Sequence, residues 1–401
     1  MRAGIIITGL AVAAAAAAPT VLTVAERVTR RAAVRPRDGG RANGAGLPRT
    51  GIDAVISAVI ARAKGGGTVA ESFQEQGGER FASTQVTTAR VSTVLRRRMT
   101  DDETDSDAER TARHLAAACR LSEGLGCEVT GCLEAVADDY RRHRRAVDLK
   151  RRSFAMPKAT IRLLSALPVV TVMLGELMGA RPVAFLLGTP QGILCLAAGG
   201  LWYAVGMAWT RRLLAGFDDA GGDGADGDDD ASIALAMLRA ALGTGAPIPR
   251  ALDAVGEALG AGADEPSPPG GIPAGLRMAG RALSRGATWH EAWVMAESSC
   301  AGTVPARARA REPPRRDGGT EPARGTAIAL IGECLAEAWR HGASPTGRLE
   351  LAIDRHDRDA LAAIEQAAAR LSVRLLAPTG LCFLPSFILI GVVPAIVSFI
   401  M

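Results

Sequence analysis

Two long apolar runs separated by a short polar turn form the strongest pattern along the chain. They cover residues 162–181 and 182–209, and Glu176 and Arg181 are the charged residues where the runs meet. Each run has the length of about 20 residues that a helix needs to cross a bilayer. Basic residues flank the pair on both outer sides: Arg151, Arg152, Lys158, Arg162, Arg211 and Arg212. The positive-inside rule therefore predicts a transmembrane hairpin over residues 159–212 with both of its ends in the cytoplasm. A buried helical hairpin of a soluble protein is the alternative.

Both ends of the chain are also apolar. Residues 375–401 contain no charge and follow Arg370 and Arg374, which predicts a C-terminal transmembrane helix that runs from inside to outside. Residues 1–24 are rich in alanine, and the basic residues come after them, in residues 25–50. This order favours an N-terminal transmembrane segment followed by a basic linker, with a cleaved signal peptide as the alternative.

Helical periodicity fills the two polar blocks, residues 51–158 and 232–374. We expect an all-α integral membrane protein with two cytoplasmic antiparallel helical bundles in tandem, each followed by transmembrane helices. The first bundle is expected to lack one helix, or to have it degraded, between Gln74 and Met99. The second is expected to have six helices, at residues 231–243, 248–260, 274–285, 288–300, 326–341 and 345–372.

Three segments of different composition interrupt the helical pattern. Residues 213–231 contain a run of aspartate and glycine and predict an acidic flexible linker, since a calcium loop would need a different spacing of ligands. Residues 262–275 and 303–325 are rich in proline, glycine or arginine and predict flexible inserts in the second bundle.

A short internal repeat predicts helical hairpins at five places. The repeat consists of a glycine that ends one helix, a residue two positions later that starts the next, and an apolar residue seven positions after the glycine. The glycines are Gly66, Gly126, Gly245, Gly286 and Gly342, and the apolar residues are Phe73, Leu133, Leu252, Trp293 and Leu349. Glycine takes the left-handed conformation that stops a helix. Thr68 with Glu71, and Thr288 with Glu291, have the spacing of capping boxes, and Ser344 precedes Pro345 as a further helix start.

The two blocks repeat on a larger scale as well. TGCLEAVADDYRRHRRA (130–146) aligns with TGRLELAIDRHDRDALA (346–362), and IRLL (161–164) and VRLL (373–376) then open the apolar segments that follow.

Composition limits the possible partners. The 401 residues carry a net charge of +5, and only 4% of them are aromatic, so few rings are present for stacking on bases and no nucleic-acid partner is expected. The basic residues lie beside apolar runs, which suits anionic membrane lipids.

The sequence contains no catalytic signature, so we expect no enzyme and assign no catalytic, cofactor-binding or metal-binding residue. None of its three lysines follows a glycine as in a Walker A loop, and its five histidines have no metal-binding spacing. The seven cysteines have no paired zinc-site spacing and are interpreted as small buried apolar residues. Glu176 could serve a proton path but is interpreted as an interfacial residue at the turn.

Several of these segments resemble the type II secretion system F family, the inner-membrane platform proteins of type II secretion and type IV pili. The segments that carry the resemblance are ACRLSEGLGCEVTGCLEAVADDYRRHRR (118–145), ALGTGAPIPRALDAV (241–255), SRGATWHEAW (284–293) and the closing LLAPTGLCFLPSFILIGVVPAIVSFI (375–400). The last is similar to the tight-adherence (Tad/Flp) pilus branch of high-GC Gram-positive bacteria. The resemblance covers residues 50–212 and 232–401, whereas an N-terminal span is not part of the family's minimal pattern.

The resemblance implies a platform in the plasma membrane that couples a cytoplasmic secretion ATPase to the extraction of prepilin or pilin subunits. It also implies assembly with itself or with a sister platform protein. The basic helix Arg141–Arg152 and the mixed-charge helix Asp354–Arg358 are the candidate faces for the ATPase; solvated faces near anionic lipid are the alternative. A membrane-anchored signalling or division scaffold and a small-solute permease subunit are the competing functions.

Overall fold

The computed structural model describes residues 48–77, 85–153, 166, 170–174, 176–177, 182–220, 223–261, 270–300 and 324–400. All regular secondary structure in these residues is helical, which confirms the predicted all-α class. The predicted N-terminal span and basic linker lie outside the described residues, apart from positions 48–50. So do most of the predicted span 162–181 and most of the two predicted inserts.

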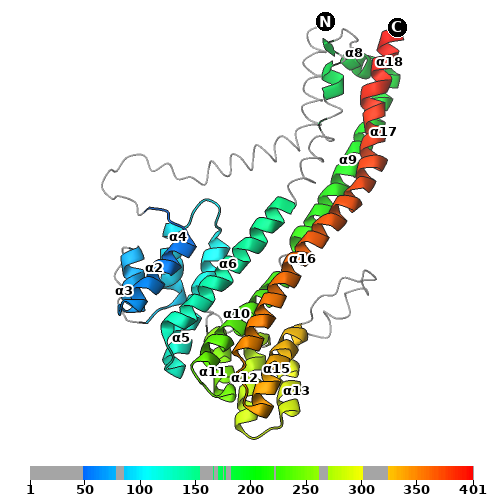
Figure 1. Ribbon diagram of the computed structural model, residues 1–401. Helices are drawn as coiled ribbons and strands as arrows, with labels where there is room; N and C mark the ends of the chain where they lie inside the picture. Colours follow the sequence, from blue (N-terminus) through cyan, green and yellow to red (C-terminus); the bar gives the residue numbers. More distant parts are fainter. Residues whose placement is uncertain are drawn as a thin grey trace. The chain divides into compact units, whose positions relative to one another are not determined.

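The chain forms two compact units (Figure 1). The helical unit consists of Gly46–Leu149 and Ala220–Ile364. The apolar unit includes Lys150–Asp219 and Glu365–Met401. Each unit is described by itself below.

The first block of the helical unit has five described helices, α2 (Ile52–Lys64), α3 (Val69–Gly77), α4 (Thr88–Arg98), α5 (Asp105–Leu125) and α6 (Val129–Ser153). The interval Gln74–Met99, where the sequence predicts a missing or degraded helix, contains α4 in its described part, and the first block has five described helices against six in the second. Val91, Val94 and Leu95 of α4 are buried in the core, and this burial stabilises the helix.

The second block has the six expected helices, α10 (Asp223–Gly243), α11 (Ile248–Gly260), α12 (Ile272–Ser284), α13 (Trp289–Cys300), α15 (Arg324–His341) and α16 (Thr346–Pro378). A flexible linker was expected over residues 213–231, but most of this stretch is helical. Helix α9 of the apolar unit reaches Ala220, and α10 begins at Asp223. Extending an existing helix costs far less than nucleating one, and apolar helical segments lie on both sides of this acidic stretch.

The five predicted hairpin glycines all adopt positive φ, between 67° and 88°. Both predicted capping boxes form: the hydroxyl of Thr68 accepts from the N–H of Glu71 at 3.2 Å, and that of Thr288 accepts from the N–H of Glu291 at 3.4 Å. The five apolar residues that follow the glycines are at most 7% exposed. Helix α16 begins at Thr346, and the Ser344 and Thr346 hydroxyls lie 2.9 Å apart. The short repeat in the sequence therefore gives one structural unit, a helical hairpin stopped by a left-handed glycine.

Helices α5 and α11 join the two blocks by capping each other. Arg120 on α5 donates to the carbonyl of Ala258 at 2.8 Å, and Arg250 on α11 donates to the carbonyl of Gly124 at 3.3 Å. Both carbonyls lie in the last turn of their helix, where acceptors lack partners within the helix and the helix dipole favours a cation. This reciprocal pairing places the two helices antiparallel.

The apolar unit contains α8 (Pro182–Gly188), α9 (Pro190–Ala220), the end of α16, and a last segment made of η1 (Thr379–Phe383), α17 (Leu384–Phe387), η2 (Ile388–Val392) and α18 (Val393–Ile400). The single run predicted over 182–209 is divided at Thr189. The Thr189 hydroxyl accepts from the N–H of Gly192 at 3.0 Å and so caps a new helix that starts with Pro190.

Among the residues that the structure describes, two helical segments are long and apolar enough to cross a membrane, as judged by length and composition. They are Pro190–Leu213, with a mean hydropathy of 1.5, and Thr346–Val392, whose most apolar window has a mean hydropathy of 2.0. Only 17% and 33% of their apolar windows are buried, which is unlike the core helix of a soluble protein.

The prolines in the last segment accompany its two π-helical stretches, η1 and η2. Pro385 has no N–H to donate to the carbonyl of Leu381 four residues earlier. The indole N–H of Trp202 on α9 donates to that carbonyl at 2.7 Å, and the Ser386 hydroxyl donates to the carbonyl of Gly199 at 2.9 Å. A side chain at Gly199 would collide with Ile390, so glycine permits this close approach.

The left-handed glycines give a direct test of the hairpin unit. We expect Gly126→Ala to lower the free energy of unfolding by about 1–2 kcal/mol, because alanine is strained at positive φ. Gly126 has nothing within 4 Å of an added Cβ, so the cost is conformational. Gly131→Ala is the matched control: this residue lies within α6 with equally open space, and alanine there should be neutral or stabilising. Chemical denaturation of the detergent-purified protein, followed by circular dichroism, measures both changes. Equal effects of the two substitutions would contradict the assignment.

Candidate functional site

The helical unit brings the two predicted charged faces together around one cavity. Helix α6 supplies one wall, α16 supplies the opposite wall, and Ser232 on α10 lies between them. The cavity has a volume of about 280 Å³. Its lining residues are Asp139, Arg142, His143, Arg145, Ala146, Ser232, Asp354, His356, Asp357, Arg358, Ala360 and Leu361. Because α6 and α16 are the helices that align in the internal repeat, the cavity lies between equivalent elements of the two blocks.

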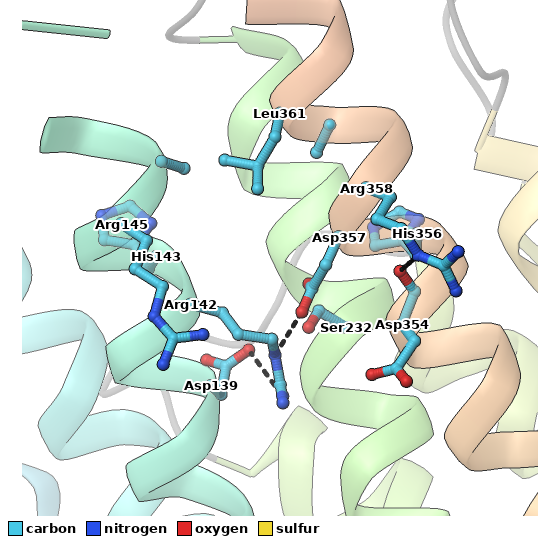
Figure 2. Close-up of a pocket in the computed structure, with 12 residues that line it drawn as sticks. Asp139, Arg142, His143, Arg145, Ser232, Asp354, His356, Asp357, Arg358 and Leu361 are labelled. Carbon is cyan, nitrogen blue, oxygen red and sulfur yellow. Dashed lines mark hydrogen bonds and ion pairs between the residues drawn. The ribbon is translucent and has the colours of Figure 1, made fainter. Parts of the chain in front are cut away.

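Arg142 connects the two walls. Its Nε lies 3.2 Å from Oδ2 of Asp357 on α16, and its Nη2 lies 4.0 Å from Oδ1 of Asp139 on its own helix. Figure 2 shows the guanidinium between these two carboxylates. The side chains of Arg142 and Asp357 are 19% and 27% exposed, so this ion pair is partly shielded from water.

Asp139 is the most deeply buried charge of the site, with a side chain that is 5% exposed. Its Oδ2 lies 3.4 Å from Nδ1 of His114 and 3.9 Å from Nη2 of Arg110, both on α5. Burial alone would raise the pKa of this carboxyl, but His114, Arg110 and Arg142 together lower the pKa below its ordinary value. Asp139 is therefore ionised at neutral pH, and its charge depends on these three neighbouring side chains.

A second buried carboxylate, Asp107, lies near the start of α5 and contacts the C-terminal half of α6. Its side chain accepts from the N–H of Thr104 at 3.0 Å in a capping box, and it lies 3.4 Å from Nε2 of His143 and 3.7 Å from Nη1 of Arg144. Burial raises the pKa of Asp107, and the bonds from His143 and Thr104 outweigh that effect, so the pKa is lowered. The capping box and the two cations thus hold α6 against α5.

Asp357 differs from these two carboxylates. Burial raises its pKa, Asp139 and Asp354 raise it further, and Arg142 only partly opposes them. One arginine thus lies between a carboxylate that keeps its charge and another that loses it more readily. The pKa shifts of the two carboxyls beside Arg142 therefore have opposite directions.

The predicted basic face Arg141–Arg152 is divided between two roles. Arg141 pairs with Asp53 on α2 at 2.8 Å and with Asp138 at 3.3 Å, and Arg142 and Arg144 also bind carboxylates of the unit. Arg145, Arg151 and Arg152 are exposed. On α16, Asp354, Arg355 and Arg358 are exposed, whereas His356 and Asp357 are half-buried. Of these exposed side chains, Arg145, Asp354 and Arg358 line the cavity.

Sequence reasoning missed the buried part of this site, because Asp139, His114 and Arg110 fall on helix faces that read as polar or mixed. The spacing of Asp139 and Arg142, three residues apart on one helix face, was the available signal. Glu176 is found at the predicted turn of the apolar unit, where its Oε1 accepts from the N–H of Val183 at 2.9 Å. In the part of the chain that the structure describes, no three metal-ligating side chains gather.

Comparisons with protein-family models, with curated proteins and with solved structures find no match to this chain. The exposed rim of the cavity carries charges of both signs, and its interior is occupied by ion pairs.

The two carboxylates on Arg142 should respond differently to neutralisation. We expect Asp139→Asn to lower the free energy of unfolding by about 3 kcal/mol, because it leaves buried cations without their carboxylate. The matched change Asp357→Asn should cost at most about 1 kcal/mol, because the pKa of Asp357 is already raised and its ionised form is less favoured. Urea unfolding at neutral pH measures both variants, and a larger loss in Asp357→Asn would overturn this ranking.

The lowered pKa values of Asp139 and Asp107 predict how stability depends on acid. A carboxyl whose pKa is lowered by folding contributes stability above its unfolded pKa of about 3.9, and this contribution is lost as the pH falls towards its folded pKa. The urea concentration at the unfolding midpoint should therefore fall when the pH of the solution is lowered from about 5 to about 2. The decrease should be shallower in Asp139→Asn and unchanged in Asp359→Asn, a substitution of an exposed residue of α16. Parallel curves for Asp139→Asn and the unmodified protein would contradict the role of Asp139.

Proposed function

We propose that this chain is a membrane-embedded platform protein of a Tad/Flp-type pilus or a type II secretion apparatus. It acts as an assembly component without catalytic activity of its own, and it couples a cytoplasmic secretion ATPase to the extraction of pilin subunits. The observation that carries the proposal is the meeting of two charged helix faces, from equivalent helices of the internal repeat, at the rim of one cavity. The resemblance of four segments to the type II secretion system F family points to the same role.

The proposed topology places both helical blocks in the cytoplasm. The membrane-spanning parts are the hairpin over residues 162–181 and 182–209 and the C-terminal segment 375–401. Support comes from the two long apolar helical segments and from the polar turn, where Glu176 binds the backbone of Val183. Charges at such turns lie at the membrane surface, where water can solvate them. The exposed Arg151 and Arg152 are suited to anionic lipid head groups on the cytoplasmic side.

Coupling requires a stiff connection between the ATPase face and the membrane. Helix α16 begins at Thr346, carries Asp354 and Arg358 in its third and fourth turns, and continues without interruption to Pro378. One helix therefore carries both the charged face and the residues that lead into the apolar segment. Pilin subunits and a second platform chain, identical or a sister protein, are the proposed partners within the membrane.

Reversal of the rim charges tests this proposal. With the tagged chain as bait in mild detergent and crosslinker, we expect a secretion-type ATPase to be recovered. The double variant Arg145→Glu and Arg358→Glu should recover at least about tenfold less ATPase, because two favourable charge contacts become repulsive. Cells that carry this variant should also lose surface pili or secreted substrate.

Arg285→Glu is the matched control. Arg285 is exposed in the helical unit but does not line the cavity, so its reversal should leave ATPase recovery unchanged. Recovery of no ATPase with the unmodified bait, together with normal piliation of a deletion strain, would reject the platform role. That result would favour the signalling or division scaffold.

A further inference from the structure

Two cysteines lie in contact at the turn between α5 and α6. Cys127 follows the left-handed Gly126, and Cys132 lies in the first turn of α6. Their Sγ atoms are 3.7 Å apart. Cys127 is half-exposed, whereas Cys132 is 1% exposed. The spacing of these cysteines in the sequence resembles no redox or metal motif, so only the fold reveals this dithiol.

The backbone around the pair is held in place. The Ser122 hydroxyl donates to the carbonyl of Cys127 at 2.6 Å, and the N–H of Gly126 donates to the carbonyl of Ser122 at 2.8 Å. A disulfide has a sulfur–sulfur length of about 2.05 Å, so the two sulfur atoms must approach by less than about 2 Å. A rotation of the two side chains can supply a movement of this size without unfolding the turn.

We propose that Cys127 and Cys132 form a reversible intramolecular disulfide when the protein meets a hydroperoxide. The inference does not depend on the proposed function. In the first step the Cys127 thiol attacks the peroxide, and its sulfur is oxidised to a sulfenic acid with loss of water or an alcohol. In the second step the Cys132 sulfur attacks the sulfenic sulfur, the disulfide forms, and a second water leaves. A low-molecular-weight thiol reverses the reaction by exchange.

The different surroundings of the two thiols set the order of these steps. Burial raises the pKa of Cys132 to about 12, and the neighbouring Cys127 contributes to this shift. Cys132 therefore stays protonated at neutral pH and is a poor first nucleophile. Cys127, which solvent reaches, meets the oxidant first, and Cys132 then acts as the resolving thiol at contact distance.

The position of the pair gives the disulfide a structural effect. Three residues before Cys127, in the last turn of α5, the carbonyl of Gly124 accepts from Arg250 of the second block. A disulfide between Cys127 and Cys132 closes the loop that directly follows this helix end. Oxidation therefore stiffens the hairpin on which the contact between the two blocks rests.

Peptide mass analysis tests the proposal on the full-length protein in detergent. The protein is treated with hydrogen peroxide, its free thiols are blocked with N-ethylmaleimide, and it is digested with trypsin without reduction. Cleavage after Arg120 and Arg141 yields a peptide, residues 121–141, that contains Cys127 and Cys132 and no other cysteine. After peroxide alone, we expect the mass of this peptide to be lower by two hydrogens, with no maleimide attached. When a thiol is added after the peroxide and before blocking, we expect the peptide to carry two maleimides.

Cys334 is the internal control, because it is half-exposed and is the single cysteine of the tryptic peptide 325–340. It should stay available to maleimide at the peroxide dose that closes the pair. In Cys132→Ser, the sulfenic acid at Cys127 should persist and be trapped by dimedone; in Cys127→Ser, Cys132 should remain a thiol. Unchanged helical circular dichroism shows that both variants are folded. Blocking of both cysteines after peroxide, a disulfide between two chains, or direct oxidation of Cys127 to sulfinic acid would overturn the inference.

Discussion

The buried carboxylate of Asp139 sets the arrangement of the helical unit. An ionised side chain that is 5% exposed loses several kcal/mol of hydration, and it is tolerated only where cations and hydrogen-bond donors surround it. Helix α5 supplies His114 and Arg110, and α6 supplies Arg142 from its next turn. Since Arg142 also reaches Asp357, the same requirement extends to α16 in the second block. Turning α6 about its axis would leave at least one of these charges buried without a partner, so this network fixes which faces of the three helices meet.

The network also shows how the two copies of the repeat have diverged. In the alignment of 130–146 with 346–362, Asp139 corresponds to Arg355, and Arg142 corresponds to Arg358. Asp139 and Arg142 of the first copy are buried or half-buried, whereas Arg355 and Arg358 of the second copy are exposed. These two equivalent positions therefore have different surroundings in the two copies. The reciprocal capping of α5 and α11 by Arg120 and Arg250 is a second polar contact between the blocks, at helix ends where carbonyls need donors.

Much of the fold could be predicted from local sequence patterns. The left-handed glycines, the capping boxes and the buried position seven residues after each glycine follow from interactions within a single hairpin, so the sequence alone could predict them. Predictions that depended on tertiary packing were less successful. The division at Thr189 was missed because hydropathy does not register a helix cap. The ion pair of Arg142 and Asp357, and the contact of Cys127 with Cys132, could not be read from spacing, since both depend on how elements meet in space.

The last segment shows how the apolar unit compensates for its prolines. In an apolar environment an unsatisfied carbonyl costs several kcal/mol, and Pro385 cannot donate to Leu381. The indole of Trp202 supplies the missing donor, and the Ser386 hydroxyl returns a bond to the carbonyl of Gly199. The two bonds run in opposite directions between α9 and the last segment, so sliding one helix along the other breaks both. Within the apolar unit, the end of α16 leads directly into the last segment, so these two bonds also hold the end of α16 to α9.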